Sequence, residues 1–119
     1  MYIAIDFDGT VVEHLFPSMG DEVPYAVEVM KKLVERGDLL LLNTMRSGVH
    51  LDEAVEWYND RCVPLYGIGK NPTQSLWTKS PKCYAHVYID DAALGCPLIR
   101  PEGRRPYVDW KKIAEMLEV

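Results

Sequence analysis

The chain has 119 residues, a formal net charge of -5 at pH 7, 48% hydrophobic residues and 26% charged residues. These values predict one globular domain over residues 1–119 with its own core. The acidic balance argues against a nucleic-acid binder that relies on bulk electrostatics. Because the chain has neither a membrane-length apolar run nor the pattern of a signal peptide, we expect a cytoplasmic protein without a membrane partner.

The first predicted strand, Tyr2–Ile5, carries the most informative motif. It is apolar and rich in β-branched and aromatic residues, and the sequence Asp6-Phe7-Asp8-Gly9-Thr10 follows it directly. In an extended chain residues i and i+2 face the same side, so the Asp6 and Asp8 carboxylates project together. Two carboxylates this close repel each other unless a cation or a shared proton lies between them.

The rest of the chain alternates predicted helices and strands. After a polar segment at 11–22, we expect a helix from Pro24 to Gly37, a strand at 39–42, a helix from about His50 to Arg61, a strand at 63–66, a loop at 67–82, a strand at 86–89, a weak strand at 98–99, and a helix at 110–117 capped by Asp109. This order predicts an α/β, three-layer Rossmann-like fold with a mostly parallel central sheet covered on both sides.

Polar side chains follow three of the predicted strands. Asp6 and Asp8 follow the first, Thr44 the second, and Asp90 with Asp91 the strand at 86–89. Parallel sheets place their sites at the carboxyl ends of the strands, so these residues are expected to converge there. A cluster of carboxylate and hydroxyl oxygens suits Mg²⁺.

Histidine and cysteine predict no zinc centre. His14, His50 and His86 lack the spacing of metal ligands and are expected at the surface or at helix caps. Three widely spaced cysteines fit neither a disulfide framework nor a zinc knuckle, and we expect reduced, mostly buried thiols. These are Cys62, Cys83 and Cys96.

The ordered motifs resemble those of the haloacid dehalogenase (HAD) superfamily. They are Asp6-Phe7-Asp8-Gly9-Thr10, Thr44 after an apolar strand, a later lysine, and Asp90-Asp91 after another apolar strand. The resemblance spans residues 6–91 and implies a HAD-like fold and a Mg²⁺-dependent phosphatase that hydrolyses phosphate monoesters.

The resemblance also implies a role for each matching residue. Asp6 is the expected nucleophile, which forms an aspartyl-phosphate, and Asp8 is the expected general acid and base. Asp6, the main-chain carbonyl of Asp8, and Asp91 or Asp90 are expected to hold Mg²⁺, with Asp91 favoured as the direct ligand. Thr44 is expected to donate its hydroxyl to a phosphoryl oxygen.

The cations of the site are less closely defined by the sequence. Lys82 best matches the family's lysine, which pairs with the nucleophile and the phosphoryl group, while Lys79 and Lys70 are alternatives. Arg46 is expected either to meet a second anionic group of the substrate or to be a surface charge. Five basic residues near the C-terminus predict a solvated loop and helix start or a rim that steers phosphate. They are Arg100, Arg104, Arg105, Lys111 and Lys112.

The chain has no room for a cap domain, since both connections that could hold one are short. An open site with 11–22 as a flap is therefore expected, and a homo-oligomer is a possible cover. A phosphorylated small molecule is the favoured substrate. The alternatives are a nucleic-acid-end phosphatase, a non-catalytic binding or scaffold protein of the same fold, and a receiver-like signalling module, whose motif order is the reverse of this one.

Overall fold

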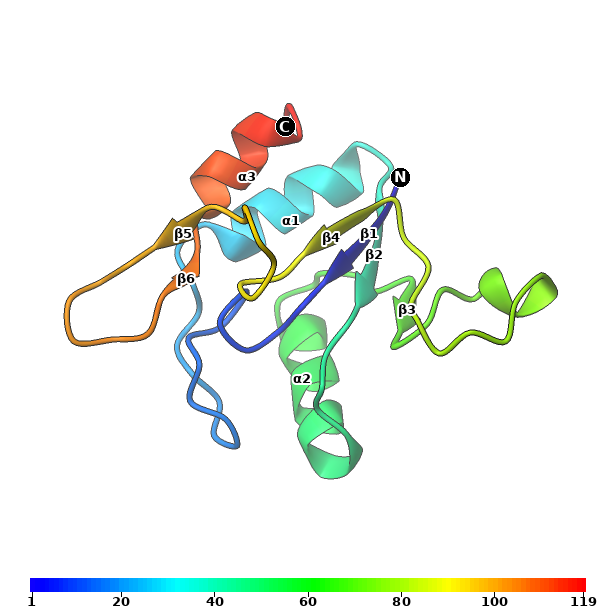
Figure 1. The fold of residues 1–119 in the computed structure, drawn as a ribbon, viewed down its shortest axis with the longest axis horizontal. Helices are drawn as coiled ribbons and strands as arrows, with labels where there is room; N and C mark the ends of the chain where they lie inside the picture. Colours follow the sequence, from blue (N-terminus) through cyan, green and yellow to red (C-terminus); the bar gives the residue numbers. More distant parts are fainter.

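The computed structural model describes residues 1–119 and contains a four-stranded parallel sheet in the order β3-β2-β1-β4 (Figure 1). The strands are β1 (Tyr2–Ile5), β2 (Leu39–Leu42), β3 (Gly67–Ile68) and β4 (Val87–Ile89). In the ladder Ile3 lies opposite Leu40 on one side and Val87 on the other. All four carboxyl ends therefore point to the same edge, as the sequence predicts.

Three helices and a small hairpin complete the fold. The helices are α1 (Ala26–Glu35), α2 (Gly48–Asp60) and α3 (Trp110–Met116), with a single 3-10 turn, η1 (Gln74–Leu76). Strands β5 (Leu98–Ile99) and β6 (Tyr107–Val108) pair antiparallel. Figure 1 shows α3 packed beside α1 and the hairpin next to both, away from β3.

One face of the sheet forms the main core. Successive strand residues face opposite sides, so Ile3 and Ile5 share a face with Leu40 and Leu42. These side chains are buried in one cluster with apolar residues of α1, α2 and α3. The apolar sides of the amphipathic helices pack on this face of the sheet.

The opposite face is covered by the segment between β3 and β4. Ala4 and Leu41 pack there against Cys83. The buried Gln74 side chain holds the segment together: its Oε1 accepts hydrogen bonds from the backbone N–H of Asn71 and Tyr84, each at 3.0 Å, and its Nε2 donates to the Lys82 carbonyl at 2.9 Å. The third layer is thus an irregular segment with one 3-10 turn.

The structure corrects several local predictions. The third strand lies at Gly67–Ile68 instead of 63–66, although Tyr66 N already donates to Leu40 O at 2.7 Å. Strand β6 was not predicted; its residues follow a loop rich in Pro, Gly and Arg, and they pair only because the hairpin closes. The spacing in α3 predicts Ile113, Met116 and Leu117 on the buried face. Trp110 and Ile113 are the buried residues of this helix, and Met116 is 58% exposed.

Other predictions are confirmed. The strand at 98–99 is β5, and Asp109 caps α3 by accepting a hydrogen bond from Lys112 N at 3.2 Å. All three cysteines are free, as predicted, but only Cys83 is buried, since Cys96 is half-buried and Cys62 is exposed. None of the helices is both long enough and apolar enough to cross a membrane.

The C-terminal segment is fastened to the turn that follows β1. The indole N–H of the buried Trp110 donates to the Thr10 carbonyl at 2.7 Å, and Val108 N donates to the Gly9 carbonyl at 3.2 Å. Residues about a hundred positions apart are thereby joined at the end of the central strand.

This contact predicts a measurable loss of stability in Trp110→Phe. The substitution keeps an aromatic ring but leaves the Thr10 carbonyl without its buried donor, which costs about 1 to 3 kcal/mol of unfolding free energy. Urea unfolding followed by circular dichroism measures it. Trp77→Phe is the matched control, because Trp77 is 63% exposed. Equal stability of the two variants would contradict the assignment.

Candidate active site

A cavity of about 390 Å³ opens at the carboxyl edge of the sheet. Asp6 follows β1, Thr44 follows β2, and Asp90 and Asp91 follow β4. Eleven residues line the cavity: Asp6, Asp8, His14, Phe16, Thr44, Met45, Arg46, Asp90, Asp91, Ala92 and Arg105. The structure therefore brings together every residue predicted for the site except the lysine.

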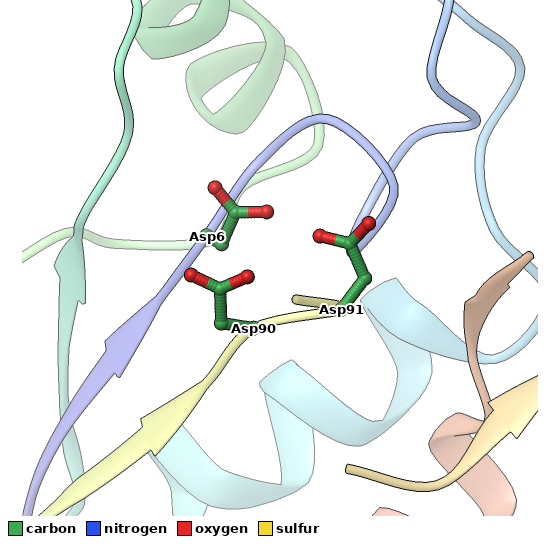
Figure 2. Close-up of side chains that lie close together, drawn as sticks. All are labelled: Asp6, Asp90 and Asp91. Atoms are coloured by element: carbon green, nitrogen blue, oxygen red, sulfur yellow. The ribbon is translucent and has the colours of Figure 1, made fainter. Parts of the chain in front are cut away.

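Three of the four carboxylates form a compact cluster. One oxygen from each of Asp6, Asp90 and Asp91 lies within 4.8 Å of the others. Figure 2 shows Asp6 above Asp90 and the Asp91 carboxylate directed toward the same space from the side. Such a set of oxygen donors matches the preference of Mg²⁺ for carboxylate ligands. The geometry admits both Asp90 and Asp91 as ligands.

The buried Thr10 hydroxyl fixes this cluster. It donates a hydrogen bond to Asp6 Oδ2 at 2.9 Å and accepts one from Asp91 N at 3.2 Å. The backbone adds a second link, because Asp6 N donates to Ile89 O at 2.9 Å. The ends of β1 and β4 are thus joined by hydrogen bonds at the point where their acidic side chains converge.

Gly9 leaves the space that Asp91 needs. Its φ is +84°, and a Cβ at this position would lie 2.4 Å from Asp91 Oδ2. Side chains rarely adopt this backbone conformation, and here one would also strike the carboxylate. The glycine of the Asp-x-Asp-Gly-Thr motif is therefore required both by the turn and by the acidic cluster.

Burial and like charges act together on Asp6. Loss of solvent contact, followed by the neighbouring Asp91 and Asp90 carboxyls, raises the pKa of Asp6 to about 8. The Thr10 hydrogen bond opposes this shift. Without a cation, Asp6 therefore holds a proton at neutral pH, and a bound cation would favour the carboxylate.

Asp8 stands apart from the acidic cluster because it is paired with Arg46. Arg46 Nε donates to Asp8 Oδ2 and Nη2 to Oδ1, both at 2.8 Å, and Nη2 also donates to the Ser18 carbonyl at 3.0 Å. The guanidinium is buried, lies 5.2 Å from the Phe16 ring, and has its pKa raised mainly by the hydrogen bonds to Asp8.

This pairing corrects the prediction of a surface charge, because the Arg46 guanidinium is buried. Contact of Arg46 with a second anionic group of the substrate stays a prediction: the residue lines the cavity, but it already donates four hydrogen bonds to protein acceptors. What it does is join the segment after β2 to Asp8 and to the flap. No local pattern predicts this pair, since Asp8 and Arg46 are 38 positions apart.

Thr44 lies where the sequence predicts. Its hydroxyl oxygen accepts a hydrogen bond from Arg46 N at 3.1 Å, and the side chain lines the cavity. A hydroxyl that accepts one hydrogen bond still has its own proton to donate. Thr44 can therefore donate to an anion in the cavity.

The expected pairing of Lys82 with Asp6 is absent. Lys82 precedes β4 and so lies toward the amino end of that strand, with its Nζ 5.2 Å from the centre of the Tyr88 ring. It lines a separate cavity with Trp77 and Tyr84. Lys79 and Lys70 are exposed and do not line the carboxylate cavity, although Lys70 follows β3 at the same edge of the sheet.

Five residues of the cavity were not predicted as site residues. They are His14 and Phe16 from the flap, Met45 from the loop after β2, Ala92 from the turn after β4, and Arg105 from the hairpin. The basic C-terminal cluster was the one available signal, because a phosphate-steering rim was among its interpretations. Of the histidines expected at the surface or at helix caps, His86 is exposed and His50 lies in the first turn of α2, whereas His14 is half-buried and lines the cavity. His50 Nδ1 lies 3.2 Å from Glu53 Oε1, and His86 Nδ1 accepts from Tyr2 N at 2.9 Å.

Comparison with known proteins finds one relative of solved structure that shows the family of this chain. A solved structure of a conserved protein from Bacteroides thetaiotaomicron is 39% identical in sequence, with a TM-score of 0.83. The match covers 99% of this chain and 89% of that one. The chain belongs to the family of that conserved protein. No protein-family model and no curated protein matches this chain.

The raised pKa of Asp6 predicts how stability depends on pH in chelator-treated protein. Between the ordinary value of 3.8 and about 8, the folded state holds a proton that the unfolded state has released, so unfolding free energy falls as pH rises. Asp6→Asn removes this titration. Urea unfolding at several pH values should show a smaller decline from pH 5 to 8 in Asp6→Asn than in the natural chain. Parallel curves would contradict the burial of a protonated Asp6.

Proposed function

We propose that this protein is a Mg²⁺-dependent phosphohydrolase of the HAD-like type, which cleaves phosphate monoesters through an aspartyl-phosphate on Asp6. The convergence of Asp6, Asp90 and Asp91 carries the proposal, since their oxygens lie within 4.8 Å of one another beside Asp8 and Thr44. These residues occur along the chain in the same order as the motifs of the HAD superfamily that the sequence resembles.

The donor set fits a magnesium ion. Asp6, the main-chain carbonyl of Asp8, and Asp90 or Asp91 would hold it, and these are hard oxygen ligands with no histidine or thiolate among them. Mg²⁺ would supply charge neutralisation between an anionic nucleophile and an anionic phosphate. The repulsion that raises the pKa of Asp6 is what such a cation would relieve.

In the first step an Asp6 carboxylate oxygen attacks phosphorus, and the bond from phosphorus to the ester oxygen breaks. The leaving oxygen takes a proton from Asp8, while the Thr44 hydroxyl donates to a phosphoryl oxygen. In the second step a water oxygen attacks phosphorus and gives a proton to Asp8. Phosphate leaves, and Asp6 returns to its carboxylate form.

The pair with Arg46 bears on the two roles of Asp8. Both Asp8 oxygens accept hydrogen bonds in this structure, a state that suits the base of the second step. To act as the acid of the first step, Asp8 must carry a proton and release at least one of these hydrogen bonds. A good leaving group such as p-nitrophenolate needs no such acid.

The cavity favours a small substrate. Its volume of about 390 Å³ is in the range of small-molecule sites. The wall carries three apolar side chains, of which Met45 is 97% exposed and Phe16 is 49% exposed. A phosphorylated small molecule is therefore the favoured substrate class. Solvent or a second copy of the chain would cover the open side of the cavity.

The nucleophile is tested by hydrolysis of p-nitrophenyl phosphate in millimolar Mg²⁺. Asp6→Asn should reduce kcat by at least a thousandfold with the fold retained, because an amide cannot form the acyl phosphate. Asp8→Asn should slow an alkyl phosphate more than the aryl phosphate, since only the alkyl leaving group needs a proton. Retained turnover in deamidation-free Asp6→Asn would refute the proposed mechanism.

The metal site is tested by Gly9→Ala against Gly37→Ala. Both glycines have positive φ, so each substitution costs roughly 1 to 2 kcal/mol in backbone strain, but only the Gly9 substitution strikes Asp91. Thermal melts with and without Mg²⁺ at matched ionic strength provide the readout. At a tenfold excess over Kd, Mg²⁺ should stabilise Gly37→Ala by about 1.4 kcal/mol and Gly9→Ala far less. Equal stabilisation of the two variants would refute the site.

A further inference from the structure

One unpaired cation faces the carboxylate cavity. Arg105 lines it from the loop between β5 and β6, is exposed, and makes no hydrogen bond or ion pair within the chain. Arg105 also lines a neighbouring cavity, together with His14 and Arg104. A long cationic side chain at a cavity wall, with its donors unused, is available to an anion.

The loop that carries Arg105 is held against the site. Two residue pairs close the β5–β6 hairpin: Leu98 lies opposite Val108, and Ile99 lies opposite Tyr107. Val108 N donates to the Gly9 carbonyl at 3.2 Å, so β6 is hydrogen-bonded to the turn that shapes the acidic cluster. Arg105 is three positions before Val108, and Pro106 between them restricts the backbone. The strand that follows Arg105 is thus hydrogen-bonded to the same turn that makes room for Asp91.

The other candidate cations are engaged or remote. The Arg46 guanidinium is buried and donates to Asp8 and to the Ser18 carbonyl. Lys82 lies toward the amino end of β4, beside Tyr88. Arg46 is thus occupied by partners within the chain and Lys82 does not line the cavity, whereas Arg105 lines it and has no partner within the chain.

The charge of the site requires such a cation. Asp6, Asp90 and Asp91 as carboxylates carry three negative charges, and a divalent cation neutralises two. The remaining charge would repel a phosphate dianion. Arg105 is the free positive charge on the wall, and a guanidinium can donate two parallel hydrogen bonds to phosphoryl oxygens.

We propose that Arg105 binds the phosphoryl group of the substrate, in the role that the resemblance to the HAD superfamily assigns to a lysine. This inference rests on the proposed function and adds to it a residue from the last quarter of the chain. It makes the β5–β6 hairpin a part of the active site.

The test compares Arg105→Ala with Arg100→Ala. Arg100 is an exposed arginine of the same loop that lines neither cavity. Binding of inorganic phosphate in millimolar Mg²⁺ is measured by calorimetry, and KM and kcat are measured with p-nitrophenyl phosphate. We expect Arg105→Ala to weaken phosphate binding by about ten- to a hundredfold, the value of a hydrogen bond to a charged group. KM should rise in parallel, Arg105→Lys should recover part of the loss, and Arg100→Ala should match the natural chain.

Two outcomes overturn the inference alone. Unchanged phosphate affinity in Arg105→Ala is one, and an equal or larger loss in Lys82→Ala or Lys70→Ala is the other. Failure of the proposed function looks different: the natural chain would then hydrolyse no phosphate monoester in Mg²⁺. Arg105-dependent phosphate binding in such an inactive protein would still support the anion site. Thermal melts of each variant separate loss of binding from loss of folding.

Discussion

Electrostatic repulsion among half-buried acids is the constraint on which this structure depends. Four parallel strands end at one edge, and two of them, β1 and β4, deliver Asp6, Asp90 and Asp91 to a space less than 5 Å across. Like charges at such distances are stable only with a proton or a cation between them. The surrounding contacts keep these acids together despite that cost.

Those contacts come from widely separated parts of the chain. Thr10 joins Asp6 to Asp91, and Gly9 makes room for the Asp91 carboxylate. Trp110 and Val108 then hold the Thr10 and Gly9 carbonyls from the C-terminal side. The turn after β1 is therefore held in place by β4 on one side and by the β5–β6 hairpin and α3 on the other. The C-terminal segment is for this reason part of the framework that positions the acidic cluster.

Residues close in sequence to a strand end were predictable, and residues brought in by tertiary contacts were not. Asp6, Asp8, Thr44, Asp90 and Asp91 follow apolar strands whose parallel order is implied by the alternation of helices and strands. The pairing of Asp8 with Arg46, the entry of Arg105 and the remoteness of Lys82 depend on loop paths, which have no periodicity to read. β6 was not predicted for the same reason. It has two residues, which pair with β5 because the hairpin closes, and so short a strand has no pattern of its own.

Chemical trapping at Asp6 tests the central claim most directly. The protein is mixed with p-nitrophenyl phosphate and Mg²⁺, quenched during turnover and treated with borohydride, which reduces an acyl phosphate to homoserine. Peptide mass spectrometry then locates the modified position. The account predicts homoserine at position 6, dependent on both substrate and Mg²⁺. Turnover with an unmodified Asp6, or with the modification at another acid, would contradict it.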